Sequence, residues 1–190
     1  MSYFDEAKRT SRTATLNVVR VDGALAFLTI ANKNRGFIGE AIVDLTDLPL
    51  IESFGRRWWA GWHKATHQYM AVANAKINGR WTSGVLLHRL IMDAPKSVDV
   101  DHVNHVMLDC RRSNLRLCTR AQNLQNRLGP QCNSTSGVRG VSWDPSRRLW
   151  RAHVTVHRQT KSLGRFRTRD EAAQAAKDGR AQLMSHAGGL

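Results

Sequence analysis

Apolar and polar residues alternate over short stretches along most of this chain. Residues 15–43 are rich in β-branched and apolar side chains and are broken by Asp-Gly and Arg-Gly pairs, which predicts two or three antiparallel strands. The next stretch, DLTDLPLIESFG (44–55), predicts a short helix. Residues 56–81 return to the strand pattern, with a hairpin turn at Asn78 and Gly79. We therefore expect the first part of the chain to be rich in β-structure.

The second half combines short strands with helices that have clear start signals. The stretches SVDVDHV (97–103) and SNLRLCT (113–119) alternate as half-buried strands do, and they can pair as a hairpin across a long loop. Thr119 followed by Gln122 has the form of a capping box, so a helix is expected directly after the second strand. Residues 137–180 predict three further strands and a final helix.

The middle strand of the last three has two different faces. Another capping box, formed by Thr168 and Glu171, opens the final helix, whose small residues would let it lie close to the sheet. Period-two alternation separates an apolar set from a polar set along the strand, namely Trp150, Ala152, Val154 and Val156 against Arg151, His153 and Thr155. We expect the first set to face the core and the second to be open to a partner.

The clearest boundary lies in the stretch LGPQCNSTSG (128–137), which collects Gly, Pro, Ser, Thr and Asn without periodicity, as a linker does. The expected fold class is α+β, with a β-rich N-terminal module, a strand–strand–helix segment, and a C-terminal three-stranded antiparallel sheet packed on one helix. The expected boundaries are a module at 1–84, the central segment at 85–127, a linker at 128–136 and the C-terminal domain at 137–190.

The basic residues are concentrated toward the C-terminus. The chain has 190 residues and a net charge of +14, and residues 111–190 carry 16 Lys and Arg against 4 Asp and Glu, a net charge of +12. Such an excess indicates a polyanionic partner, either nucleic acid or an anionic membrane surface. Only two of these 16 residues are Lys, and the planar fork of arginine suits phosphates and guanine edges, which favours nucleic acid.

The residues around the predicted hairpin form a candidate catalytic group. Asp101 would supply a carboxylate oxygen at the end of the first strand, and Asn123 an amide oxygen from the helix that follows. Two oxygen ligands with open positions suit Mg²⁺ or Mn²⁺. His102 could take a proton from water. Neighbours in a regular strand point to opposite faces, so Asp101 and His102 can share a site only at a strand end or a bulge.

This segment resembles the HNH nuclease family, and in particular its homing-endonuclease branch from phages and mobile introns. The resemblance implies that Asp101 binds the metal and that His102 is the general base. It also implies that Asn114 holds the histidine by a hydrogen bond and that Asn123 is the final metal ligand. The resemblance covers residues 85–127 and rests on four stretches, HRLI (88–91), VDH (100–102), SNLRL (113–117) and QNLQN (122–126).

The C-terminal domain resembles the plant ethylene-response-factor type of DNA-binding domain, relatives of which occur in phage homing endonucleases. The resemblance rests on RGVSW (139–143), WRAHV (150–154), LGRF (163–166) and EAAQAA (171–176). An open three-stranded sheet has the width to enter a major groove, where Arg can recognise guanine. The residues expected to contact DNA are Arg139, Trp143, Arg151, His153 and Ser162 on the resemblance, with Arg148 in a turn contacting phosphate.

Other interpretations of these residues compete with this one. His102, His105, Cys110 and Cys118 could bind structural zinc, but the chain has no CxxC pair. Three cysteines without paired spacing argue against a disulfide framework, and no stretch approaches the length of a membrane span. We expect a soluble, monomeric protein in the cytoplasm of a bacterial host, encoded by a phage or another mobile element.

The function predicted from the sequence is a sequence-specific DNA endonuclease of the HNH homing type. It would hydrolyse phosphodiester bonds in double-stranded DNA with one divalent metal ion, Mg²⁺ or Mn²⁺, as cofactor. The first alternative is a DNA-binding regulator that has lost cleavage, and metal-dependent nicking of plasmid DNA would separate the two. The second is an indiscriminate nuclease of the toxin kind, which a map of cleavage sites would reveal.

Overall fold

The computed structural model divides the chain into two compact units, residues 1–118 and residues 119–190. It describes residues 17–185 except 55–56, 65, 78–79, 128, 131–132 and 157. The fold class is confirmed at the level of a mixed, β-rich protein with several small antiparallel sheets and few helices. The division falls between Cys118 and Thr119, ahead of the linker predicted at 128–136.

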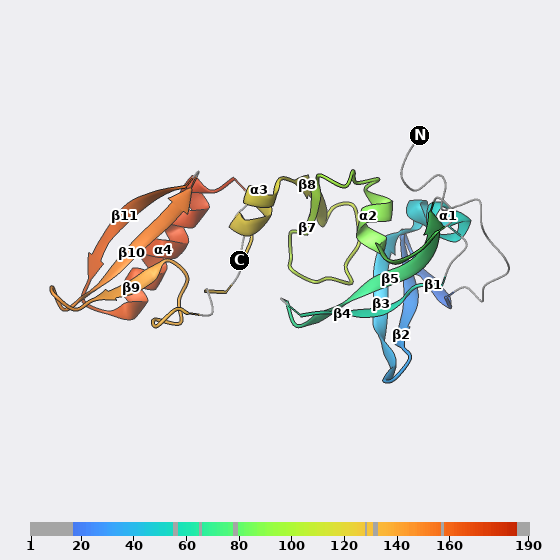
Figure 1. Cartoon of the computed structure of the whole chain (residues 1–190), viewed down its shortest axis with the longest axis horizontal. Coiled ribbons are helices and arrows are strands. Elements are labelled where there is room, and N and C mark those ends of the chain that lie inside the picture. Colours follow the sequence, from blue (N-terminus) through green and yellow to red (C-terminus); the bar gives the residue numbers. More distant parts are fainter. Residues whose placement is uncertain are drawn as a thin grey trace. The chain divides into compact units, whose positions relative to one another are not determined.

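The first unit contains three small antiparallel sheets, in the orders β1-β2-β3, β4-β5-β6 and β7-β8 (Figure 1). A short 3-10 helix, η2, and the helices α1 and α2 connect them. The bounds are β1 Val19–Asp22, β2 Leu25–Asn32, β3 Gly36–Asp44, η2 Leu45–Asp47, α1 Leu48–Ser53, β4 Trp59–His63, β5 Gln68–Ile77, β6 Arg80–Leu86, α2 Leu87–Ile91, β7 Asp99–His102 and β8 Leu115–Cys118.

One apolar core holds these sheets together. Alternate residues of β2, such as Leu28 and Ile30, are buried against α2 and the inner faces of β3, β4 and β5. The same core contains Val100 from β7 and Leu115 from β8. Burial of apolar area is the main driving force of folding, so the β7-β8 hairpin depends on the N-terminal sheets for its stability.

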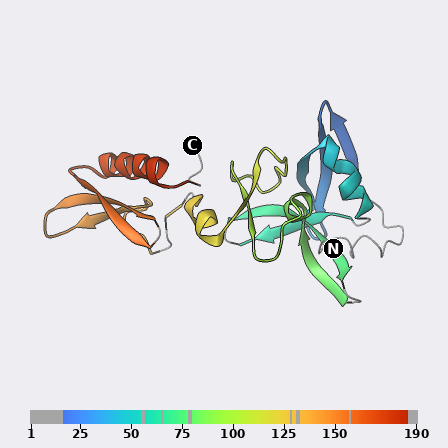
Figure 2. The same cartoon turned by 90° about the horizontal axis from the view of Figure 1, so that it is seen from above.

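The second unit begins with the short helix α3 and continues into a three-stranded antiparallel sheet in the order β11-β10-β9. Helix α4 runs along one face of this sheet (Figure 2). Ala172 and Ala176 of α4 are fully buried against Ala152 and Val141, because small side chains allow close approach. The bounds are α3 Arg120–Gln125, β9 Val141–Asp144, β10 Leu149–Val156, β11 Gln159–Phe166 and α4 Arg169–Leu183.

Several local predictions are confirmed. Both capping boxes are present, with the Thr119 and Thr168 hydroxyls accepting hydrogen bonds from the backbone N–H groups of Gln122 and Glu171. In β10, Ala152 is buried and Arg151 is exposed, as the alternation predicted. The helix predicted in 44–55 is α1. The hairpin turn predicted at Asn78 and Gly79 lies outside the described residues.

Two glycines in the second unit give a matched test of this packing. Both have a positive φ, but a Cβ on Gly137 would meet nothing within 4 Å, whereas one on Gly140 would lie 2.5 Å from the His153 carbonyl oxygen. Gly137→Ala should lower the free energy of unfolding by about 1 kcal/mol through backbone strain alone, and Gly140→Ala by about 3 kcal/mol or more. Hydrogen exchange of the β10 amides in increasing urea measures both, and equal effects would contradict the close contact.

Candidate functional site

Asp101 and His102 are the last two residues of β7, the strand-end position at which neighbouring side chains can share a site. Both are buried, at 7% and 4% exposure. Asp101 lies opposite Arg116 on β8, and its Oδ2 accepts hydrogen bonds from Arg116 Nε at 2.9 Å and Nη2 at 2.7 Å. The structure therefore places a carboxylate and an imidazole next to each other at one end of the hairpin.

His88 is the nearest aromatic neighbour described for His102. It lies on α2, and the two rings meet edge to face with centroids 4.8 Å apart. Burial lowers the pKa of His88 to about 3, with a smaller contribution from His102. Burial also lowers the pKa of His102 to about 4, opposed by the carboxylates of Asp101 and Asp109. Both imidazoles are neutral near pH 7, the form that can accept a proton.

Asn114 holds the loop between β7 and β8 in shape. Its Oδ1 accepts a hydrogen bond from the Asn104 N–H at 2.9 Å, and its Nδ2 donates to the Asp109 carbonyl at 2.8 Å. Its own carbonyl accepts from the Val103 N–H at 2.9 Å. These three bonds fix the backbone that follows His102, so Asn114 supports the site through the loop. A hydrogen bond from Asn114 to His102 itself stays a prediction.

Asp109 is the buried carboxylate at the centre of this loop. Arg111 donates to it from Nε and Nη2, at 2.8 and 2.6 Å, and Asn104 Nδ2 donates at 2.8 Å. The hydrogen bond from Arg111 is the main reason that the pKa of Asp109 is lowered. A carboxylate with several donors stays ionised when buried, so Asp109 can serve as a fixed anion that orders the loop.

The N-terminal sheets also hold the loop. The Ile42 N–H donates to the Leu108 carbonyl and the Ile42 carbonyl accepts from the Cys110 N–H, both at 2.8 Å, which forms a parallel bridge to β3. Gln68 on β5 donates from Nε2 to the His105 carbonyl at 2.9 Å. Arg112 donates to the buried Asp47 at distances of 2.7 to 3.0 Å. The N-terminal module thus positions the hairpin directly.

The oxygen donors expected for a metal come from different units. Asp101 belongs to the first unit, and Asn123 lies on α3 in the second. A carboxylate and an amide oxygen fit a hard cation that keeps several of its waters, which is the chemistry predicted for Mg²⁺ or Mn²⁺. Within the described ranges, no three His, Cys, Asp or Glu side chains are grouped so that they could hold a metal ion. The ligand pair therefore stays a prediction.

The polar face of the C-terminal sheet carries three of the residues predicted to contact DNA. Arg151 pairs across the sheet with Ser142 and Arg165, and His153 pairs with Ser162. Directly opposed residues share a face, so Arg151, Ser162 and their partners lie on one side, away from the face that packs on α4. Arg151 is exposed and His153 is half-buried.

The other three predicted DNA contacts lie elsewhere. Trp143 is opposite Trp150, on the side of the sheet that holds the apolar residues, with the two rings 5.1 Å apart. Arg148 is exposed in the turn before β10, with φ at 53°. Arg139 is half-buried and donates hydrogen bonds to backbone carbonyls near the end of α3. For all three residues, contact with DNA stays a prediction.

Comparison with known proteins shows which segment carries a family signature. Residues 75–125 match the HNH endonuclease family model. The chain is also 37% identical over 76 residues to Protein 3.8 of Escherichia phage T7, an alignment that covers 40% of this chain and 60% of the phage protein. No solved structure gives a significant match. These findings support an HNH segment and a phage relative.

Sequence reasoning found the HNH segment but missed the residues that hold it. Gln68, Asn104, Asp109 and Arg116 all bond to the loop or to Asp101 in the structure. Only a polar residue in an otherwise apolar strand, as at Gln68, could have indicated such a role from the sequence.

No helix among the described residues is long and apolar enough to cross a membrane.

The two buried histidines should make stability depend on pH. Their pKa values in the folded protein, about 3 and about 4, lie below the ordinary value of 6.5, so the unfolded chain binds more protons in the window between. Stability should therefore be complete above pH 6.5 and fall as pH decreases, by up to ~1.4 kcal/mol per pH unit for each histidine. Urea denaturation of wild type and His88→Leu measures this slope.

His88→Leu should reduce the pH dependence of the free energy of unfolding by the part that one histidine contributes, up to ~1.4 kcal/mol per pH unit. His67→Asn, at an exposed position whose φ of 53° Asn tolerates, leaves both buried rings in place and should keep the wild-type slope. If His88→Leu and wild type showed the same pH dependence, His88 would not be buried in its neutral form.

Proposed function

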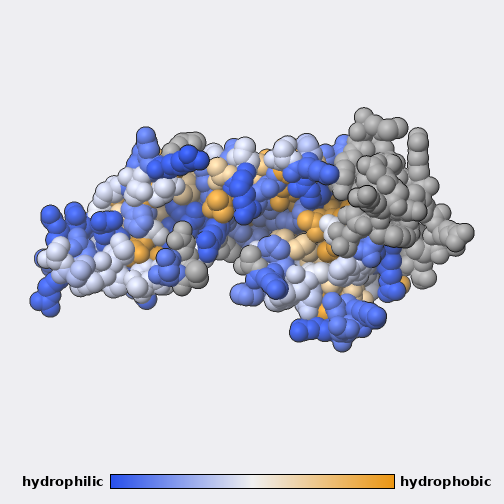
Figure 3. All heavy atoms as spheres, in the orientation of Figure 1, coloured by the Kyte–Doolittle hydropathy of each residue, from blue (hydrophilic) through white to orange (hydrophobic). Residues whose placement is uncertain are grey.

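We propose that this protein is a metal-dependent DNA endonuclease of the HNH homing type, which binds its target in double-stranded DNA. The observation that carries the proposal is the buried Asp101–His102 pair at the end of β7, within the segment that matches the HNH family model. The 16 basic residues of 111–190 add a surface suited to a polyanion. Hydrophilic side chains are spread over the coloured part of the surface, with smaller apolar patches between them (Figure 3).

In this proposal His102 takes a proton from the attacking water. The imidazole is neutral at physiological pH and is fixed by its edge-to-face contact with His88 and by the loop that Asn114 holds. A group held in one orientation is a better base than a mobile one, since part of the entropy is lost before the reaction.

Asp101 and Asn123 would hold the divalent ion. When bound, such an ion stabilises the negative charge that develops on the phosphate and on the leaving oxygen. Arg116, which donates to Asp101 Oδ2, would hold that carboxylate in one orientation. The second ligand comes from the resemblance, which assigns Asn123 to the role.

The C-terminal sheet would recognise the target sequence. Its polar face presents Arg151, His153 and Ser162, and the fork of Arg151 can pair with a guanine edge. Arg148 in the adjacent turn suits a phosphate contact, which gives affinity without sequence preference.

A second candidate function is a DNA-binding regulator without cleavage. It is favoured by one observation: the Asp101 carboxylate already forms two hydrogen bonds with Arg116, which compete with a cation for the same oxygen. Cleavage assays in Mg²⁺ separate the two functions, because a regulator would bind the target and leave both strands intact.

His102→Ala should abolish cleavage of target DNA, with a loss of ~10²–10⁴ in rate, and should leave DNA affinity nearly unchanged.

Cleavage by the wild type should require Mg²⁺ or Mn²⁺ and should stop in excess EDTA, and zinc should not restore it. The rate is measured by single-turnover cleavage, and affinity by a titration in EDTA.

His105→Asn is the matched control for this experiment. His105 lies in the same loop, is half-buried and has a φ of 62°, a conformation that Asn tolerates. It should cut at close to the wild-type rate. Wild-type cleavage by His102→Ala, or full activity in EDTA, would overturn the assignment of the base or of the metal.

Arg151→Ala and Arg148→Ala should affect DNA binding differently. Loss of the exposed strand arginine should cost about 1–3 kcal/mol at one or two base pairs and relax specificity there, whereas loss of the turn arginine should weaken binding to all sequences alike. Titrations of both variants against a target and a scrambled duplex give the comparison. If Arg151→Ala lowered both affinities equally, the sheet face would not recognise sequence.

A further inference from the structure

Helix α3 is too short to be stable by itself. It spans only Arg120–Gln125, none of its residues is buried, and an isolated helix needs roughly 12–15 residues to form in water. Its N-terminus has its own capping box, which Thr119 and Gln122 form. The last carbonyls of an α-helix have no partner within the helix, so those at the C-terminal end of α3 need donors from outside it.

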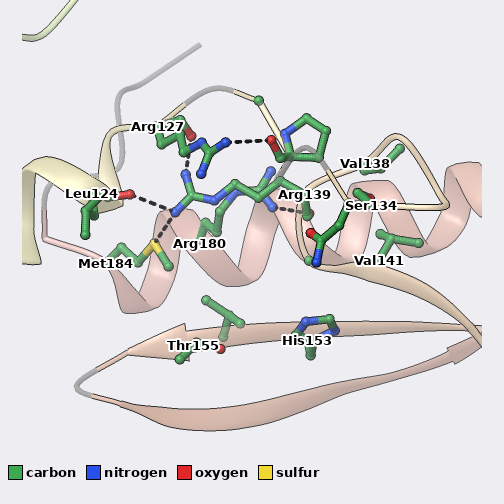
Figure 4. A pocket seen from close by; sticks show the side chains of 15 residues that line it. Leu124, Arg127, Ser134, Val138, Arg139, Val141, His153, Thr155, Arg180 and Met184 are labelled. Carbon is green, nitrogen blue, oxygen red and sulfur yellow. Dashed lines mark hydrogen bonds between the residues drawn. The ribbon is translucent and has the colours of Figure 1, made fainter. Parts of the chain in front are cut away.

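Arg139 supplies these donors. Its Nη1 donates to the Gln125 carbonyl at 3.0 Å. As Figure 4 shows, Nη1 also donates to the Arg127 carbonyl and Nη2 to the Leu124 carbonyl, the latter at 3.2 Å. A fourth contact runs from Nη2 to Met184 Sδ at 3.9 Å. All four N–H groups of the two terminal nitrogens are thus engaged, and a cation at a helix C-terminus is also favoured by the helix dipole.

Arg139 is in turn held by the C-terminal unit. Arg180 on α4 donates from Nη1 to the Arg139 carbonyl at 2.8 Å. The buried Ser136 hydroxyl donates to the Val138 and Val141 carbonyls, which fixes the backbone on both sides. Gly140 follows, in a conformation with φ at +79° that few other residues adopt.

Burying the charged guanidinium of Arg139 costs free energy, and its hydrogen bonds to the carbonyls at the end of α3 compensate for this cost. Burial, together with Arg180 and Arg127, lowers its pKa from the ordinary value. None of the residues that line the surrounding cavity of about 390 Å³ is acidic, and residues 111–143 contain no Asp or Glu. Carbonyl oxygens are therefore the groups that compensate its charge, and a guanidinium in contact with three of them has little capacity left for DNA.

We propose that Arg139 is a positioning residue that attaches α3, and with it Asn123, to the rest of the second unit, whose sheet is proposed to recognise DNA. The inference rests on the proposed function, in which Asn123 is a metal ligand. Its consequence is that one ligand of the catalytic metal is carried by the unit that recognises the target. The sequence-based expectation that Arg139 contacts DNA would be replaced by this role.

The test compares Arg139→Gln, Arg139→Lys and wild type in the full-length chain. The Asn123 N–H donates to the Thr119 carbonyl and the Asn126 N–H to the Asn123 carbonyl, so hydrogen exchange at these two amides reports the opening of α3. Arg139→Gln should speed their exchange by at least about tenfold, because several hydrogen bonds to a charged group are lost. Exchange of the β10 amides should be unchanged.

Cleavage gives a second and independent readout. Arg139→Gln should raise the Mn²⁺ concentration needed for half-maximal cleavage by about tenfold or more, while target affinity in EDTA stays within about twofold of wild type. Arg139→Lys should recover part of both effects, since an ammonium can reach some of the carbonyls but not all. Arg127→Gln removes the same charge from the same cavity and, among the described residues, one side-chain hydrogen bond, to Pro130, and it should leave exchange unchanged.

Wild-type exchange at Asn123 and Asn126 in Arg139→Gln would overturn the proposal. So would a loss of target affinity in EDTA as large as the loss of cleavage, because Arg139 would then be a DNA contact. If Arg139→Gln failed to fold, Arg139→Lys would decide the question by the same two readouts. If the wild type did not cleave DNA, the proposed function would fail, and the exchange measurement would still test the attachment of α3.

Discussion

The loop between β7 and β8 is held by hydrogen bonds to polar groups, and the geometry of the candidate site depends on this constraint. The side chain of Asn114 spans the loop, and the Asp109 carboxylate accepts hydrogen bonds from Arg111 and Asn104. Ile42 of β3 forms hydrogen bonds with the backbone of the loop. Buried polar groups of this kind are costly unless all are satisfied. A satisfied network has one arrangement, so the loop keeps Asp101 and His102 at the strand end in a fixed orientation.

The N-terminal sheets and the C-terminal unit contribute to function in different ways. The sheets share one apolar core with the hairpin and bond to its loop through Gln68 and through Asp47, so they position the candidate base and carboxylate. Within the second unit, Arg139 forms hydrogen bonds with the end of α3, and the sheet has a polar face that includes Arg151. The first unit thus holds the candidate base and carboxylate, and the second carries the proposed ligand Asn123 together with the sheet face proposed for recognition.

Local features of the fold were predictable because they depend on neighbours in the sequence. The capping boxes of α3 and α4, the helix α1 and the alternation in β10 follow from residues only a few positions apart. The order within a polar segment was less accessible from the sequence. The stretch 128–137 has the composition of a linker, yet Ser136 is buried and bonded within the C-terminal unit, because hydrogen bonds can order a polar segment that has no periodicity.

The sequence by itself determined which residues are candidates for the site, since Asp101, His102, Asn114 and Asn123 all lie in the segment that resembles the HNH family, and the family match covers the same segment. Only the tertiary structure decided what holds them. The contact of His102 with His88, the bond of Arg116 to Asp101 and the attachment of α3 by Arg139 join residues 14, 15 and 12–15 positions apart, respectively. Such partners are chosen by how strands and helices pack, and one arginine in a sequence does not reveal whether it will meet a phosphate or a carbonyl.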